Sequence, residues 1–98
     1  LKEEKTVIDT ITTSLFTAYP NPFSEHTHIN YDVKESGYVN ISVYNTCGRK
    51  IATIVNSKNH QPGQFTALFE SANIPAGIYY IVLLTGKENS TQKAIKMK

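Results

Sequence analysis

The stretch YVNISVYNTCGRKIATIV, residues 38–55, determines the predicted fold. Val39, Ile41 and Val43 alternate with polar residues, as they do in a strand with one buried face. β-Branched residues dominate the stretch and favour a pleated sheet over a helix. Residues 45–48 (NTCG) then interrupt the pattern, and Gly48 can adopt the positive φ that a tight turn requires. Apolar residues resume at 51–55, so the stretch predicts an antiparallel hairpin.

Further strand candidates surround this hairpin at residues 14–19, 27–33, 64–70, 78–84 and 91–98. The 27–33 segment alternates, whereas 78–84 (IYYIVLL) is apolar throughout and predicts a central strand covered on both faces. The intervening segments 56–63 and 71–77 are expected to be loops. About seven strands without a helical pattern predict an all-β sandwich with Greek-key connections, and a small barrel is the alternative. The residues expected to pack between two sheets are Val39, Ile41, Val43, Phe65, Phe69, Tyr79 and Ile81.

Length and charge limit the possible functions. Ninety-eight residues are enough for one domain, and a net charge of +2 gives no indication of a nucleic-acid partner. No apolar run approaches the length needed to span a membrane. The opening residues, LKEEKTVIDT, lack the features of a signal peptide and resemble the cut edge of a longer protein. We therefore expect residues 1–14 to be an exposed, protease-sensitive linker and residues 15–98 to be the domain.

The residue types that carry chemistry form no complete site in the sequence. His26 and His28 would share one face of a strand, but two histidines do not complete a zinc site, and solvent-facing side chains are expected. Cys47 stands alone, with no neighbouring base to activate it. The tyrosines at 31, 38, 44, 79 and 80 could form an aromatic platform for sugars, although core and rim positions are the simpler interpretation. The sequence thus predicts neither catalysis nor a cofactor.

Several motifs occur in a fixed order along the chain. YPNPF at 19–23 precedes T-x-I-x-Y at 27–31, and G-x-V-x-I-x-VYN-x-x-GR at 37–49 follows. PAGIYY at 75–80 and K-x-I-x-MK at 93–98 complete the series. In this order the motifs resemble the type A C-terminal sorting domain of the type IX (Por) secretion system of Bacteroidetes-like bacteria. The resemblance covers roughly residues 15–98, with Phe69 where the family often has Trp and Glu70 where Asp is common.

The resemblance implies an Ig-like sandwich that serves as a secretion address and is not an enzyme. Its partners would be an upstream cargo domain, the outer-membrane translocon and a sortase-like peptidase that cuts within or before residues 1–14. The product would be secreted or held at the cell surface after transit through the periplasm. A monomer without membrane insertion is expected, and the cargo is not specified. A carbohydrate-binding module or an Ig-like spacer of a secreted enzyme is the alternative.

The motif residues are also the candidates for recognition. The proline-rich corner, the hairpin turn and the apolar strand have folding roles, whereas the hairpin and the lysine-rich last strand offer exposed groups to a receptor. We expect that last strand to lie at a sheet edge, with its backbone or lysines available for strand addition or charge attraction. Deleting residues 96–98 is accordingly expected to abolish export and to leave most of the sandwich folded. The candidates are Pro20, Asn21, Pro22, Gly48, Arg49, Lys50, Gly77, Tyr79, Lys93, Lys96 and Lys98.

Overall fold

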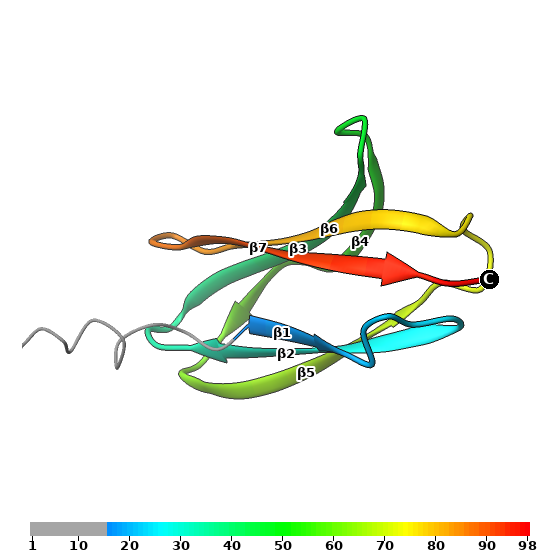
Figure 1. Ribbon diagram of the computed structural model, residues 1–98. Helices are drawn as coiled ribbons and strands as arrows, with labels where there is room; N and C mark the ends of the chain where they lie inside the picture. The colour runs from blue at the N-terminus through cyan, green and yellow to red at the C-terminus, as the bar shows by residue number, and fades with distance from the viewer. Residues whose placement is uncertain (1–15) are drawn as a thin grey trace, which may run out of the picture.

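The computed structural model describes residues 16–98, and these form strands and connecting loops without a helix (Figure 1). The predicted linker at residues 1–14 lies outside the described residues. No helix that could cross a bilayer occurs in the part of the chain that is described. The strands are β1 (Phe16–Tyr19), β2 (His26–Val33), β3 (Gly37–Asn45), β4 (Lys50–His60), β5 (Gly63–Glu70), β6 (Gly77–Leu84) and β7 (Asn89–Lys96).

The strands form two packed sheets, with the order β1-β2-β5 in one and β4-β3-β6-β7 in the other. Figure 1 shows the three-stranded sheet as one layer and the four-stranded sheet as the second. All pairs of neighbouring strands are antiparallel, and the chain changes sheet after β2, β4 and β5. Because the sheets are separate, the barrel alternative is wrong and the Ig-like sandwich is confirmed.

Alternation of apolar and polar residues explains how the layers pack. In β2, Ile29, Tyr31 and Val33 are buried while the intervening residues are partly exposed. A one-residue slip in the pairing of β2 with β5 would turn this apolar set toward solvent, so burial fixes the register. In β2 the sequence pattern alone therefore places one face of the strand in the core.

The predicted core is confirmed with one partial exception. Ile41, Val43 and Ile81 have no exposed surface, and Val39, Phe69 and Tyr79 are also buried. Phe65 packs against this cluster but remains partly exposed. The cluster also contains Val55 of the central hairpin and residues from the other strands and the corner: Phe23, Ile29, Tyr31, Val33, Leu83 and Ala94.

The predicted loop at 56–63 is wrong for most of its length. β4 continues to His60, and its last residues pair with the start of β3, with Gly37 opposite His60 and Val39 opposite Lys58. The register shifts between Val39 and Ile41, where β4 carries an extra residue and Ser57 has a φ of 49°. A bulge of this kind breaks the alternation that marks a strand, which is why the polar stretch resembles a loop.

β6 occupies the predicted central position, but the prediction that both of its faces are covered is wrong. The strand lies between β3 and β7. Tyr79, Ile81 and Leu83 face the core, whereas Ile78 and Leu84 are 39% and 41% exposed on the opposite face. Within residues 16–98 a single layer packs on this sheet, so the continuous apolarity of β6 does not reflect burial on two sides.

Candidate functional site

The corner between β1 and β2 lies against the edge of β7, and Asn21 makes the first contact. Its side-chain Nδ2 donates a hydrogen bond to the carbonyl oxygen of Lys93 at 2.9 Å. The backbone N–H of Ile95 in turn donates to Asn21 Oδ1 at 3.0 Å. One amide side chain thus supplies the donor and the acceptor that a neighbouring strand residue would offer to an edge.

Phe23 extends this contact with its own backbone. Its N–H donates to the Ile95 carbonyl at 2.9 Å, and the Met97 N–H donates to the Phe23 carbonyl at 2.7 Å. The result is an isolated parallel bridge between Phe23 and Lys96. The Phe23 side chain is 1% exposed, and its ring centroid lies 6.1 Å from that of Phe69, so this residue fills the end of the core.

Together Asn21 and Phe23 cap the outer edge of β7 from Lys93 to Met97, which we call the edge cap. β7 is an edge strand, as predicted. The expectation that its backbone is free for strand addition is wrong over the capped length, because those groups already have partners. The edge from Asn89 to Gln92 lies outside the cap.

Buried hydroxyls hold the corner in place from behind. Thr27 has no exposed surface, and its Oγ1 donates to the carbonyl of Pro20 at 2.8 Å. Ser71 is 1% exposed, and both its Oγ, at 3.2 Å, and its N–H, at 2.8 Å, donate to the Glu25 carbonyl. Sequence reasoning assigned no such role to Thr27 or Ser71. A Thr inside the T-x-I-x-Y motif is a weak signal, and the isolated Ser71 gives none.

The PAGIYY segment reaches the same end of the domain from β6. Gly77 pairs with Lys96 and has a φ of 152°, a conformation that L side chains rarely adopt. The buried Tyr79 donates from its hydroxyl to the Pro75 carbonyl at 2.6 Å and closes the turn before the strand. A tyrosine that bonds backbone a few residues upstream is a recurring corner device in Ig-like sandwiches. Three motifs far apart in the sequence therefore meet beside β7.

A comparison with protein-family models identifies the family to which this chain belongs. The model of the secretion system C-terminal sorting domain, found in type IX secretion, matches residues 17–97. The chain belongs to that family. No curated protein matches it. No solved structure does so either.

The lysines of the sorting domain differ in their surroundings. Lys93 and Lys98 are exposed, but Lys96 is only 6% exposed. The expectation that Lys96 presents its charge on an exposed strand is wrong, because alternation turns its side chain inward beside Ala94. Its Nζ donates to the carbonyl of Met97 at 2.7 Å. The lysine stem is therefore buried in the domain, and the ammonium has a hydrogen-bond partner within it.

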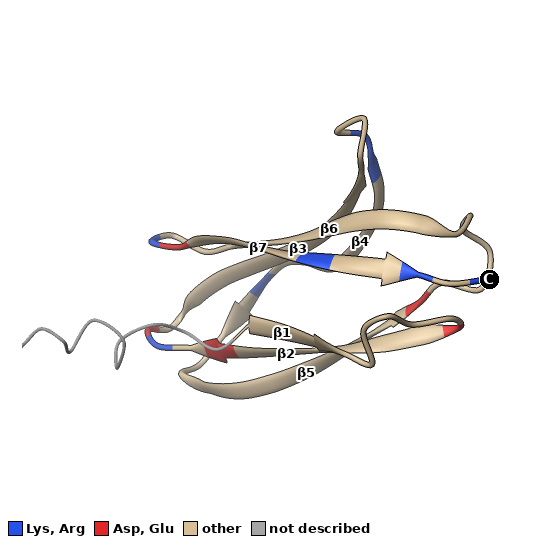
Figure 2. Cartoon of the chain, in the orientation of Figure 1, with Lys and Arg blue, Asp and Glu red and all other residues tan. Residues whose placement is uncertain are grey.

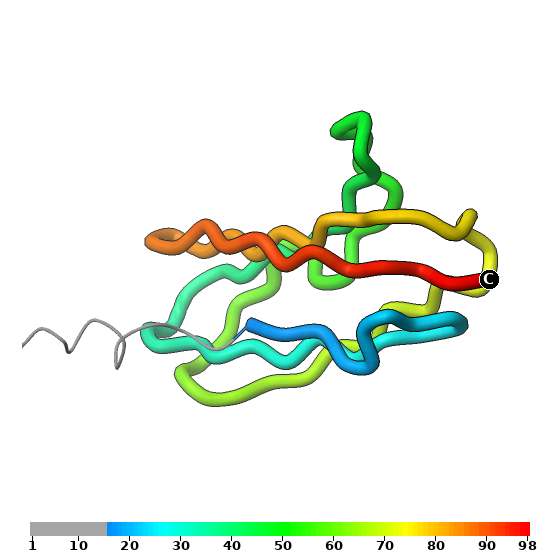
Figure 3. Tube along the Cα trace, in the orientation of Figure 1, coloured from blue at the N-terminus to red at the C-terminus, as the bar shows by residue number. Residues whose placement is uncertain are grey.

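The second group of recognition candidates lies apart from the edge cap. Gly48, Arg49 and Lys50 are exposed on the β3–β4 hairpin, which projects away from the three-stranded sheet in Figures 1 and 3. Asn45 Oδ1 accepts hydrogen bonds of 3.0 Å from the N–H groups of Cys47 and Arg49. Gly48 has a φ of 82°, the left-handed conformation predicted for this turn. The YPNPF, PAGIYY and K-x-I-x-MK motifs thus meet at one end of the domain, which we call the composite end. Gly48, Arg49 and Lys50 lie apart from it on the projecting hairpin.

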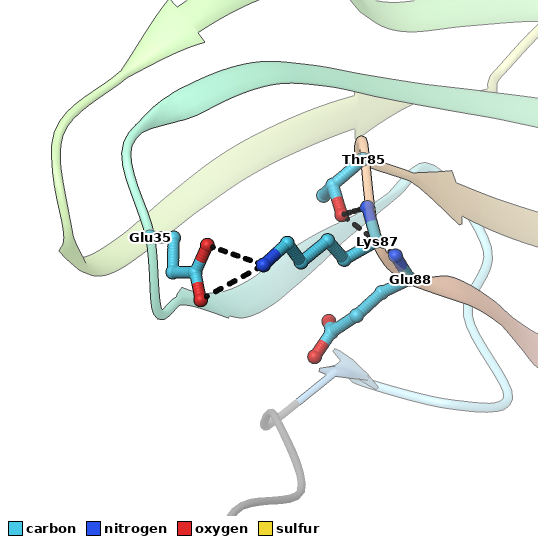
Figure 4. Close-up of polar contacts among 4 residues, drawn as sticks. All are labelled: Glu35, Thr85, Lys87 and Glu88. Atoms are coloured by element: carbon cyan, nitrogen blue, oxygen red, sulfur yellow. Dashed lines mark hydrogen bonds and ion pairs between the residues drawn. The ribbon is translucent and has the colours of Figure 1, made fainter.

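A second polar feature lies where the β2–β3 and β6–β7 turns approach each other. Figure 4 shows the Lys87 ammonium against the Glu35 carboxylate, with Nζ 3.1 Å from one oxygen and 3.4 Å from the other. Thr85 Oγ1 accepts from the N–H groups of Lys87 and Glu88 and shapes the β6–β7 turn. The turns border a hollow of about 500 Å³. The Lys87–Glu35 pair is exposed on both sides, and such pairs contribute little to stability.

The remaining candidates for chemistry do not assemble in the described residues. His26 and His28 lie with ring centroids 5.5 Å apart. Within residues 16–98 no group of three or more His, Cys, Asp or Glu side chains could hold a metal ion. Cys47 is exposed and free. Tyr31 and Tyr79 are buried in the core, so the five tyrosines do not form one sugar platform.

Proposed function

We propose that this domain is a non-catalytic signal that directs an upstream cargo protein through the type IX outer-membrane translocon. The observation that supports it best is the convergence of the corner, the PAGIYY segment and the last strand in one composite end. A receptor for unrelated cargo has to recognise a surface that the domain itself supplies. The edge cap is such a surface, because it depends on motif residues and on no feature of the cargo.

The exposed groups at this end suit recognition. Tyr19 is 74% exposed, and Pro20, Asn21 and Pro22 are exposed beside it. Lys93 on β7 and Lys98 beyond its end add positive charge, and exposed charges favour fast, orientated association with an acidic receptor. We assign recognition to the solvent-facing side chains of this end, together with Arg49 and Lys50 on the hairpin. Tyr79 and Lys96, which are buried, and Gly77, which is exposed but has a φ of 152°, serve the fold that presents these side chains.

The later steps of export complete the proposal. A sortase-like peptidase removes the domain by cutting within or before residues 1–14, and the cargo is released or attached at the cell surface. The domain acts as a monomer and needs no cofactor. Cutting and recognition suit different parts of the chain, because a peptidase requires an extended segment that it can bind, whereas a receptor requires a fixed surface.

Secretion of a reporter tests this function. Residues 1–98 are fused behind an inert periplasm-directed reporter in a host that carries the type IX machinery, and the medium and cell surface are assayed. The intact fusion should be exported with the domain removed, while the reporter alone should stay in the periplasm. Periplasmic retention of a folded intact fusion would contradict the proposal, and binding of the domain to a glycan array would favour a carbohydrate-binding module instead.

Substitutions at the composite end sharpen the test. Replacing Lys93 and Lys98 by Gln removes exposed charge without altering the edge cap, so export should fall while the melting temperature is unchanged. Deleting residues 96–98 also removes the Met97 N–H that bonds Phe23, and this variant should lose stability as well as export. The deletion therefore cannot separate folding from recognition, whereas the lysine variants can. Unchanged export of the Lys93→Gln/Lys98→Gln fusion would exclude these charges from the address.

A further inference from the structure

The outward side of β6 carries an apolar stripe. Tyr79, Ile81 and Leu83 are buried against the other sheet, so the alternate residues Ile78, Tyr80, Val82 and Leu84 lie on the opposite face. Tyr80 and Val82 are half-buried, and the residues at the two ends are about two-fifths exposed, 39% and 41%. The solvated face of an antiparallel sheet normally carries polar side chains. Four successive apolar side chains on a solvated sheet face are therefore unusual.

Neighbouring strands widen the stripe and give it a cationic margin. Tyr80 lies between Tyr44 of β3 and Lys93 of β7, and Lys50 of β4 lies opposite Tyr44. The row from Lys50 through both tyrosines to Lys93 crosses all four strands. We call the surface formed by this row and the β6 stripe the outer face. An apolar centre with charged residues at its margin is the usual anatomy of a protein interface.

Charge is segregated between the two sheets. The charged side chains in the four-stranded sheet are Lys50, Lys58, Lys93 and Lys96, whereas those in β1, β2 and β5 are Asp32 and Glu70. Figure 2 shows this separation along the strands as blue segments in one layer and red segments in the other. Within residues 16–98, the ion pairs join Lys34 to Asp32 and Lys87 to Glu35. Lys50 and Lys93 therefore face solvent without an acidic neighbour in the described part of the chain.

The outer face is also hollowed on one side. A depression of about 350 Å³ is lined by Tyr38, Asn40, Tyr44, Lys50 and Leu84, among others. The β3–β4 hairpin rises on this side of the sheet, as Figures 1 and 3 show. A recess beside an apolar stripe can accept an anchoring side chain, the feature on which binding energy concentrates in protein interfaces.

We propose that the outer face docks a protein surface whose apolar side chains are flanked by carboxylates. The inference rests on the proposed function, since that partner would belong to the export machinery. Charge complementarity favours this kind of partner, because Lys50 and Lys93 at the two margins match acidic groups on either side of an apolar anchor. Two copies of this domain docking through their outer faces would bring like charges together. A lipid headgroup layer fits less well, because polybasic membrane sites cluster about 4–8 cations and the outer face has a projecting hairpin.

A matched pair of variants tests the surface. Leu84→Glu places a carboxylate on the outer face, and Leu68→Glu places one on the outward side of β5, where Leu68 is 47% exposed. Export of the reporter fusion should fall about tenfold or more for Leu84→Glu and stay near wild type for Leu68→Glu, as expected for an interface anchor. At Lys93, export should decrease in the order Lys, Arg, Gln, Glu. Circular dichroism and thermal melting establish that each variant is folded before export is compared.

Photo-crosslinking identifies the chemistry of the partner. p-Benzoylphenylalanine at position 82 of the exported fusion should crosslink to protein segments in which apolar residues are flanked by Asp or Glu, and the same group at position 68 should not. Flotation with phosphatidylglycerol-containing vesicles and sedimentation of the purified domain distinguish the other occupants. Lipid binding or dimerisation that Leu84→Glu abolishes would overturn the inference. Normal export of the Leu84→Glu fusion would also overturn it while leaving the proposed function intact, whereas failure of the wild-type fusion would refute the function itself.

Discussion

Asn21 Nδ2 donates a hydrogen bond to the carbonyl of Lys93, a residue 72 positions away in the sequence. With the return bond from the Ile95 N–H, this side chain stands in for a missing strand beside β7. The relationship gives the PNPF motif a definite task, because the same four residues turn the chain and close an edge that would otherwise invite unwanted pairing.

Replacing Asn21 by Ala should therefore destabilise the domain. Two hydrogen bonds are lost at a partly solvated edge, and at about 0.5–1.5 kcal/mol each the free energy of unfolding should fall by about 1–3 kcal/mol. Urea denaturation measures the change. Asn59→Ala is the control, since Asn59 is exposed and its side chain makes no hydrogen bond within residues 16–98. Equal stability of the two variants would refute the proposed role of Asn21.

Replacing Ile41 by Ala tests the central hairpin. Ile41 has no exposed surface and lies between Val55 of β4 and Leu83 of β6. Removing a buried aliphatic side chain costs its transfer free energy and leaves a cavity, so unfolding should become easier by about 2–4 kcal/mol. The solvent-facing change Leu68→Ala should cost less than about 0.5 kcal/mol. A change of only a few tenths for Ile41→Ala would contradict the core described here.

The hairpin turn depends on Gly48 through its backbone conformation. A Cβ added there meets no atom within 4 Å, so space is not the constraint, but its φ of 82° is costly for an L residue. Gly48→Ala should destabilise the domain by about 1–2 kcal/mol. Gly86→Ala provides the control, because a Cβ at Gly86 also meets nothing within 4 Å and no left-handed φ is required. Indistinguishable melting curves for the two variants would show that the turn tolerates a side chain.

A hydrogen bond between the sheets predicts a pH dependence at alkaline pH. The Tyr31 hydroxyl and His60 Nε2 lie 2.8 Å apart, and His60 Nδ1 lies 2.9 Å from the Lys58 carbonyl. Because a carbonyl only accepts, Nδ1 carries a proton, and in the neutral ring Nε2 accepts from Tyr31. Burial raises the pKa of the Tyr31 phenol above its usual value of about 10. The folded state therefore holds the phenolic proton more tightly than the unfolded chain does.

The stability that Tyr31 contributes should be complete below about pH 10 and should be lost as pH rises through the raised pKa. Tyr31→Phe should lower the free energy of unfolding by about 1 kcal/mol at pH 7, and the gap to wild type should close above pH 10. Urea denaturation between pH 7 and 11.5 measures both curves. Tyr38→Phe, at a position 68% exposed, is the control and should follow wild type throughout. A constant gap between Tyr31→Phe and wild type would contradict the linkage.

Local pattern was enough to predict much of this domain. Alternation placed Val39, Ile41 and Val43 in the core, and the NTCG interruption located the hairpin turn at Gly48. These features follow from the two-residue period of a strand and from the steric freedom of glycine, which depend only on neighbouring residues. The family was also predictable, because its motifs are short segments in a fixed order.

Tertiary structure alone decided which segments meet. Lys96 is buried and Lys93 exposed because the pairing of β6 with β7 sets which side of β7 faces the core. Asn21 caps β7 because the two sheets pack with the corner at that edge, and no local pattern encodes a contact across 72 residues. The sequence by itself thus determined the strands, the central turn and the family. Only the packing of two sheets decided which apolar face of β6 remained open and which backbone groups were already satisfied, because both depend on partners far away in the chain.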